Sequence, residues 1–278
     1  MSRCGRIRNW PLANSRQTYI VLIMKPEKEQ NIDAILNHWP FDPMNVNVRM
    51  LKLRQRTILE MRIDMGILQM ETEGRPDGYN PYGADTYYEF LRKQSSKLGD
   101  DEFELDEEHC LEIDREFVQF YHRRVCWLQL KEFHKAVADA DHTLGLMDFC
   151  KQHSPDEEWT FSHERYRPFV LYHRTQAAAL AYMPEEEGAV DDSAEPEKAI
   201  EQINRGLEDM RNLFLEHEAE DQYEQDELVM RLNEFRQSIR DNYGVGMTLQ
   251  ERIDKAIENE NYEEAAQLRD ELDQRNES

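Results

Sequence analysis

The chain has 278 residues, enough for one large domain or two smaller ones with a buried core. Hydrophobic residues make up 39% and charged residues 33%, which excludes a chain that is disordered throughout. Acids outnumber bases by 58 to 34. Because the formal charge of −24 repels phosphates and anionic lipids, we expect neither direct nucleic-acid binding nor membrane binding.

The cysteines and the apolar runs bear on the compartment. The four cysteines form no C-x-x-C pair, which is typical of thiols in a reducing environment. The longest apolar run, Tyr19 to Met24, has six residues and is too short for a signal-peptide core or a membrane span. We therefore expect a cytoplasmic protein.

The first residues predict a basic arm that leads into a small α+β segment. Residues 1–16 contain four arginines and no acid, and they show no hydrophobic period, which predicts a flexible arm. The α+β segment is expected over residues 17–98. A short helix is predicted near Asn31–Leu36, because Pro40 prevents its continuation.

Residues 46–73 alternate between apolar and charged side chains, which is the period of a strand. Asp64-Met65-Gly66 supplies a turn, so the pattern predicts an antiparallel meander with one face in water and one face covered. A helix from about Thr86 to Lys97 closes the segment. Leu98 to Glu108 is expected to be a solvated acidic linker.

Gly74-Arg75-Pro76-Asp77-Gly78 follows the predicted strands and is a strong turn cluster. We interpret it as a structural turn. The alternative is a binding lip, formed together with the tyrosines Tyr79 and Tyr82. The competing class of function is an enzyme, or a regulator of one, whose site lies in the N-terminal meander.

Residues 107–243 have helical periodicity and an internal repeat. Tyr121-His122-Arg123 recurs as Tyr172-His173-Arg174 at an offset of 51 residues, and each copy is expected to open an apolar helix. Lys135-Ala136 recurs as Lys198-Ala199 at an offset of 63 residues.

The acidic stretch 184–196 explains the difference between the two offsets as a surface loop. We therefore predict two helical hairpins. Because two units rarely stack alone, further helices at about 107–122 and 222–241 are expected to cap them.

The first hairpin contains Leu128-x-Leu130-Lys131-Glu132-Phe133-x-Lys135-Ala136, which resembles the tetratricopeptide (TPR) repeat. Alanine at a helix crossing lets two backbones approach closely. The glycine that commonly ends the first helix of a TPR repeat is Lys131 here, and the second copy is interrupted. The predicted fold class is mainly α, with a TPR-like array of helical hairpins between the small N-terminal α+β meander and a C-terminal helical hairpin.

Residues 247–275 predict that C-terminal hairpin. Thr248-Leu249-Gln250-Glu251 is a capping box, and Asn261-x-x-Glu264 caps a second helix. Gly244 and Gly246 separate the hairpin from the preceding helix. Apolar residues recur at helical spacing on one face of each helix: Leu249, Ile253, Ala256 and Ile257 on the first, and Ala265, Leu268 and Leu272 on the second.

These residues resemble the UVR motif of UvrB, UvrC, the McsA activator and some Clp ATPases, with the core Tyr262-x-x-Ala265-Ala266-x-Leu268-Arg269-Asp270 intact. The resemblance implies that the hairpin binds another protein, and a carrier of the same motif and a second copy are among the candidates. It does not imply DNA incision, because nothing outside the hairpin resembles the excision nucleases. The implied partner-binding residues are Leu249, Ile253, Ala256, Ile257, Tyr262, Ala265, Ala266, Leu268, Arg269, Asp270 and Leu272.

Physical arguments also favour a docking role for the hairpin. About thirty residues are too few to fold alone, so the hairpin must lean on its own body, a second copy or a partner. Its nine acids and four bases give a net charge of −5, which makes a poor DNA surface. The alternative is that it is simply the third helical pair of the body, since Tyr262-x-x-Ala265-Ala266 echoes Phe133-x-x-Ala136-Val137.

A search for catalytic and metal-binding motifs finds no candidate. The sequence has no H-E-x-x-H motif, no phosphate-binding glycine loop and no nucleophile elbow. His122 and Cys126 lie four residues apart on one helix, and we interpret this as chance placement. We therefore expect a non-enzymatic adaptor without a cofactor. The resemblance leaves an accessory role in nucleotide excision repair, or in a kinase or Clp-type protease system, as the alternative.

Overall fold

A computed structural model of the protein describes residues 32–99, 102–184 and 194–276. The chain divides into two compact units, residues 1–40 and residues 41–278. In the first unit, α1 spans Asp33–His38, close to the helix expected before Pro40. The predicted basic arm and the apolar run Tyr19 to Met24 lie outside the described residues.

The second unit begins with a three-stranded antiparallel sheet in the order β1-β2-β3. Its strands are β1 (Asn47–Leu53), β2 (Arg56–Ile63) and β3 (Gly66–Glu71). Leu59 on the central strand lies opposite Met50 of β1 and Met70 of β3. The predicted meander and its turn before Gly66 are therefore confirmed.

The central strand is covered on both faces. On one face, Leu59 and Met61 pack against Trp127 of the helical body. On the other face, Glu60 and Arg62 are also buried. Glu60 accepts a hydrogen bond from Arg49 Nε at 2.7 Å, and Arg62 Nη1 donates to the Gly66 carbonyl at 2.9 Å. The expected wet face is wrong for β2, because cross-strand pairing of the charged groups permits their burial.

The segment after the sheet contains the 3-10 helix η1 (Pro81–Gly83) and helix α2 (Tyr87–Leu98). The Thr86 hydroxyl caps α2 by accepting from the amide of Glu89 at 3.1 Å, which confirms the predicted helix.

The acidic linker that follows α2 is less solvated than expected. Phe103 and Leu105 are buried, and the Leu105 amide donates to the His153 carbonyl at 2.9 Å. The prediction of a solvated linker is therefore wrong at these two positions, because burial of their apolar side chains outweighs the solvation of their acidic neighbours.

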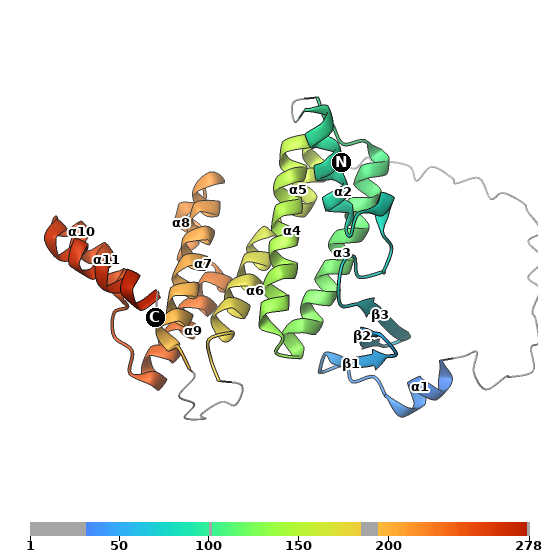
Figure 1. Ribbon diagram of the computed structural model, residues 1–278, viewed down its shortest axis with the longest axis horizontal. Coiled ribbons are helices and arrows are strands. Elements are labelled where there is room, and N and C mark those ends of the chain that lie inside the picture. The colour runs from blue at the N-terminus through green and yellow to red at the C-terminus, as the bar shows by residue number, and fades with distance from the viewer. Residues whose placement is uncertain (1–31, 100–101, 185–193, 277–278) are drawn as a thin grey trace, which may run out of the picture. The chain divides into compact units, whose positions relative to one another are not determined.

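The rest of the body is helical, and its helices stack in sequence order (Figure 1). The helices are α3 (Glu107–Gln129), α4 (Phe133–His153), α5 (Glu157–Glu164), α6 (Arg167–Leu180), α7 (Pro196–Glu216), α8 (Glu220–Tyr223) and α9 (Glu227–Tyr243). Helix α4 packs against α3 and α6, and α7 packs against α6 and α9. The predicted fold class, a mainly α array of helical hairpins, is confirmed. Among the described residues, none of the helices has the length and apolarity needed to cross a bilayer.

Several details of the predicted array need correction. Helix α3 is continuous from Glu107, so the separate capping helix over 107–122 is wrong. Tyr121-His122-Arg123 and Tyr172-His173-Arg174 lie inside α3 and α6 rather than at their starts. Helix α9 corresponds to the other predicted cap. The acidic insertion falls between α6 and α7, with residues 185–193 outside the described part of the chain.

The turn between α3 and α4 has the backbone conformation for which a TPR repeat commonly uses glycine, and here Lys131 adopts it. Lys131 has a φ of +59°, in the left-handed region that favours glycine, and the Glu132 amide donates to the Trp127 carbonyl at 2.9 Å. This hairpin runs from Glu107 to His153, longer than the 34 residues of a TPR unit. The TPR resemblance therefore stays an interpretation of the segment around the turn.

Candidate functional site

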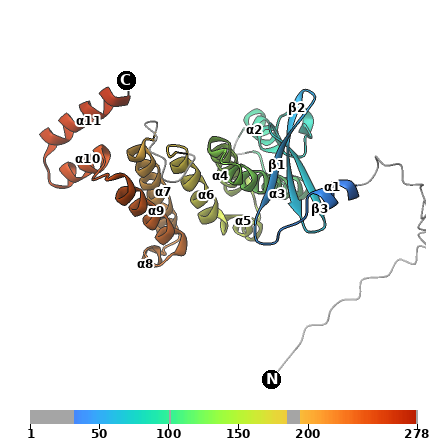
Figure 2. The ribbon, with the colours of Figure 1, turned by 90° about the horizontal axis from the view of Figure 1, so that it is seen from below.

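The C-terminal hairpin is formed by α10 (Leu249–Glu258) and α11 (Tyr262–Asn276), which lie side by side in Figures 1 and 2. The predicted capping box is present. The Thr248 hydroxyl accepts from the Glu251 amide at 3.3 Å, and Glu251 accepts from the Thr248 amide at 2.9 Å. At the start of α11, Asn261 Nδ2 donates to Glu264 at 2.7 Å. Both helix starts are therefore fixed by neighbouring side chains.

The turn of the hairpin repeats the geometry found between α3 and α4. Glu260 has a φ of +57°, and the Asn261 amide donates to the Ala256 carbonyl at 2.8 Å. The echo between the two sequences thus includes the backbone of the turn. A residue with a β-carbon is strained in this conformation.

Replacement of Glu260 by glycine is expected to stabilise the hairpin by about 1 kcal/mol, because glycine adopts a positive φ without strain. Amide hydrogen exchange in α10 and α11 should slow about fivefold. Glu271→Gly, at an exposed position inside α11, is the control and should instead speed exchange, because glycine weakens a helix interior. Faster exchange in both variants would contradict the assignment of strain to Glu260.

The structure divides the predicted partner-binding residues into two groups. One group fills the interior of the hairpin and consists of Leu249, Ile253, Ala256, Ala265 and Leu268, which are buried, with Leu272 half-buried beside them. The other group is exposed and consists of Ile257, Tyr262, Ala266, Arg269 and Asp270. The first group holds the two helices together, and only the second is accessible to a partner.

Four exposed residues form what we call the exposed strip: Ile257, Tyr262, Ala266 and Arg269. Tyr262, Ala266 and Arg269 recur at spacings of four and three, so they share one face of α11. Ile257, in the last turn of α10, is separated from Tyr262 by the short turn alone. The side chains of Ile257 and Tyr262 are 41% and 67% exposed, so two large apolar groups face solvent on either side of the turn.

The hairpin is attached to the body through polar contacts. Glu251 accepts hydrogen bonds from Arg240 on α9 and, at 3.0 Å, from Asn204 on α7. Arg275 pairs with Glu197 on α7. Burial raises the pKa of Glu251, but the hydrogen bonds from Arg240, the Thr248 amide and Asn204 outweigh it and hold this pKa below its usual value. Glu251 therefore stays ionised at neutral pH and serves both the helix cap and the attachment.

The space between the hairpin and α7 is incompletely filled. A pocket of about 290 Å³ lies there, lined partly by Leu249, Leu272 and Arg275 of the hairpin and by Glu201 and Arg205 of α7. The apolar cluster inside the hairpin is formed by Leu249, Ile253, Leu268 and Leu272, all from α10 and α11. These observations favour a hairpin with its own small core, held to the body by polar contacts, over a third helical pair packed into the body.

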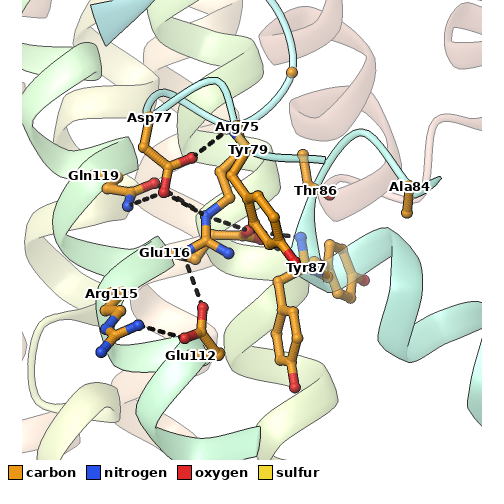
Figure 3. A network of polar contacts seen from close by, with 12 residues as sticks. Arg75, Asp77, Tyr79, Ala84, Thr86, Tyr87, Glu112, Arg115, Glu116 and Gln119 are labelled. Atoms are coloured by element: carbon orange, nitrogen blue, oxygen red, sulfur yellow. Dashed lines mark hydrogen bonds and ion pairs between the residues drawn. The ribbon is translucent and has the colours of Figure 1, made fainter. Parts of the chain in front are cut away.

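A second region of interest is the loop Gly74-Arg75-Pro76-Asp77-Gly78, which is held against α3 by Arg75 (Figure 3). The Arg75 side chain is buried, and its Nη2 donates to Glu112 at 3.0 Å. Its Nε donates to Gln119 at 3.2 Å and lies 3.2 Å from Asp77. The arginine therefore joins the loop to the helix.

Glu116 connects the same network to α2. Its side chain is fully buried and accepts from the amides of Tyr87 at 2.7 Å and Tyr88 at 2.9 Å. The Nε2 atom of His142 lies 2.9 Å from Oε1 of the same carboxylate. Glu116 thus binds the N-terminus of α2, where backbone amides lack helical partners.

These contacts support the structural turn over the binding lip. The carboxylates of Asp77, Glu112 and Glu116 are all engaged in holding the loop and α2. This network could not be predicted, because Arg75 and Glu112 are 37 residues apart in the chain and no motif joins them.

His122 and Cys126, the pair with metal-ligand spacing, lie one turn apart on α3. Cys126 is fully buried in the cluster with Leu59 and Trp127, and burial raises the pKa of its thiol to about 12. Burial also lowers the pKa of His122. Apolar side chains enclose the thiol, and a free cysteine in such surroundings behaves as a small hydrophobe. The geometry favours Cys126 as a core residue.

Comparison with known proteins agrees with the hairpin geometry. Residues 248–274 match the family model of the UvrB/uvrC motif, UVR. No curated protein and no solved structure matches the chain. The match begins at the capping residue Thr248 and covers nearly all of α10 and α11. The C-terminal hairpin of this chain is therefore a UVR motif.

Proposed function

We propose that the chain is a non-enzymatic adaptor that holds a partner protein through the exposed strip of its UVR hairpin. The observation that carries this proposal is that some residues of the motif are buried and others are exposed. Buried residues such as Ile253 and Leu268 complete the hairpin, while Ile257 and Tyr262 stay on its surface. Exposed tyrosines beside aliphatic groups are typical of residues that dominate protein interfaces.

The non-enzymatic part of the proposal is supported by the state of the titratable groups. Glu112 and Glu116 are engaged by Arg75 and by the amides of α2, so neither carboxylate is placed for acid–base work. Burial raises the pKa of the Cys126 and Cys150 thiols, which makes both poor nucleophiles.

Removal of the exposed apolar groups is the direct test. The full-length double variant Ile257→Ser/Tyr262→Ser is expected to lose at least about thirtyfold in affinity for a captured partner, the equivalent of about 2 kcal/mol for an interface anchor. Capture from an extract of the source cells, with mass spectrometry of the retained proteins, identifies the partner. Titration of that purified partner then measures the loss.

The matched control is Lys255→Ser/Glu271→Ser, which changes exposed residues of the same two helices and leaves the net charge unaltered. It should retain the partner. Substitution of Leu249, Ile253 or Leu272 by Asp is a poor test, because these residues belong to the hairpin core and the hairpin would unfold. Equal capture by the wild type and the strip variant would refute docking through the strip.

The identity of the captured protein separates the roles that a UVR motif allows. An excision nuclease subunit would indicate an accessory role in nucleotide excision repair. A kinase or a Clp-type ATPase would indicate regulation of that system. The adaptor proposal itself depends only on whether capture requires Ile257 and Tyr262.

A further inference from the structure

The charges around the exposed strip narrow the class of partner. We infer that the strip takes a basic amphipathic helix of another protein, not a second copy of this chain. This inference rests on the proposed docking function, because it concerns the same strip.

The surface of the hairpin is strongly acidic. Its exposed acids outnumber its exposed bases by eight to four. The acids are Asp254, Glu258, Glu260, Glu263, Glu264, Asp270, Glu271 and Asp273, and the bases are Arg252, Lys255, Arg269 and Arg275. Arg275 is already paired with Glu197 of the body, so its charge is not available to a partner's acids.

The acids also lie close to the strip in the sequence and on the helices. Glu258, Glu260 and Glu263 surround the turn that joins Ile257 to Tyr262. Asp273 follows Arg269 by four residues and so continues the face of the strip along α11. The strip therefore presents its apolar side chains and the cation of Arg269, with an acidic border around them.

Pairing of this strip with its own copy would bring two hairpins of the same sign together. Each hairpin has nine acids and four bases, a net charge of −5. Charges across an interface lie within the Debye length of about 8 Å at physiological salt, so solvent ions screen them only partly. Like charges held in apposition lower affinity, whereas a border of lysine or arginine on the partner would raise it.

The shape of the strip favours a helix as the occupant. Ala266 stands between the longer side chains of Tyr262 and Arg269, so the face of α11 has a small residue at its middle. Side chains of a partner helix pack closely where the opposing helix has a small residue. Recognition of an amphipathic helix through spaced apolar anchors is an established mode of binding.

The test uses the full chain and two synthetic helical peptides of about 18 residues, or five turns. Both peptides carry the same leucine stripe, and their remaining positions are mainly lysine in one and glutamate in the other. Fluorescence anisotropy should show that the lysine peptide binds at least about tenfold more tightly. Its affinity should fall between 50 and 500 mM salt, by about tenfold.

Three double variants test whether the peptide binds at the strip and its acidic border. Ile257→Ser/Tyr262→Ser should weaken the lysine peptide about tenfold, while Lys255→Ser/Glu271→Ser should leave it unchanged. Asp270→Lys/Asp273→Lys should reduce the preference between the two peptides. Because the whole chain is acidic, preference for the lysine peptide that survives the strip variant would overturn the inference.

Sedimentation of the full chain gives the competing outcome. A dimer that is abolished by Ile257→Ser/Tyr262→Ser would show that a second copy occupies the strip and would overturn the inference, yet it would leave docking through the strip intact. Equal binding of both peptides, or binding of neither, would overturn it as well. Failure of the docking proposal is recognised separately, by a partner from the cell extract that the strip variant still captures.

Discussion

Replacement of Glu116 by alanine is expected to lower the free energy of unfolding by about 3–5 kcal/mol. The carboxylate is fully buried and accepts from the amides of Tyr87 and Tyr88 at the start of α2. Without it, both amides, the buried Arg75 and the ring of His142 lose their common partner. Each buried polar group without a partner costs its full desolvation.

Chemical denaturation of the full chain, followed by circular dichroism, measures this effect. Glu116→Gln keeps one acceptor oxygen and should cost less than Glu116→Ala. Glu112→Ala is the matched control, because that carboxylate also contacts Arg75 but is 24% exposed and can be replaced by water. It should cost about 1 kcal/mol. Equal losses for Glu112→Ala and Glu116→Ala would show that burial of the network contributes nothing.

Gly206→Ala should be the next most damaging change, with a loss of about 1–3 kcal/mol from overpacking. A β-carbon at Gly206 on α7 would overlap the hydroxyl and methyl groups of Thr175 on α6 and would lie 2.6 Å from the Thr175 β-carbon. The two helices pack tightly at this crossing, so one of them must shift. The expected sign is informative, because alanine otherwise stabilises a helix relative to glycine by about 1 kcal/mol.

A second substitution shows whether the clash is the cause. Thr175→Ala/Gly206→Ala removes the overlapping hydroxyl and methyl groups but not the Thr175 β-carbon, so it should recover part of the loss. Gly246→Ala is the control, since a β-carbon there meets nothing within 4 Å. A neutral or stabilising Gly206→Ala would mean that the α6–α7 crossing is looser than the structure indicates.

The features that could be predicted from the sequence are those whose causes lie close together in the chain. Thr248 and Glu251 are three residues apart, and their capping box was predictable because both partners are visible in one short window. The meander was predictable because alternation is a property of each strand. The same applies to α2 with its cap at Thr86.

The predictions that were wrong concern residues whose structure depends on contacts distant in the sequence. Phe103 and Leu105 stand in an acidic stretch, and only their contact with the end of α4 buries them. The full length of α3 does not follow from the repeat, because the repeated Tyr121-His122-Arg123 suggests a boundary at a point where the helix has no break. Arg75 gave no signal at all, since its partners Glu112 and Gln119 are supplied by α3.

The candidate site was predictable as a motif but not as a surface. The helical period places Ile257 on the apolar face of α10, beside Ile253 and Ala256. In the structure Ile257 is 41% exposed, because α11 covers only part of that face. Which residues of a two-helix unit remain accessible depends on the rotation of the second helix, and the sequence pattern does not specify that rotation.

The contacts of Glu251 restrict how the hairpin can move when a partner binds it. The same carboxylate starts α10 and binds Arg240 on α9, and Arg240 also donates to the Gly246 carbonyl within the connection. The hairpin therefore cannot swing on the Gly244–Met247 connection without loosening its own first turn. A partner that pulls on the hairpin would therefore load three polar contacts with the body: those of Glu251 with Arg240 on α9 and Asn204 on α7, and that of Arg275 with Glu197 on α7.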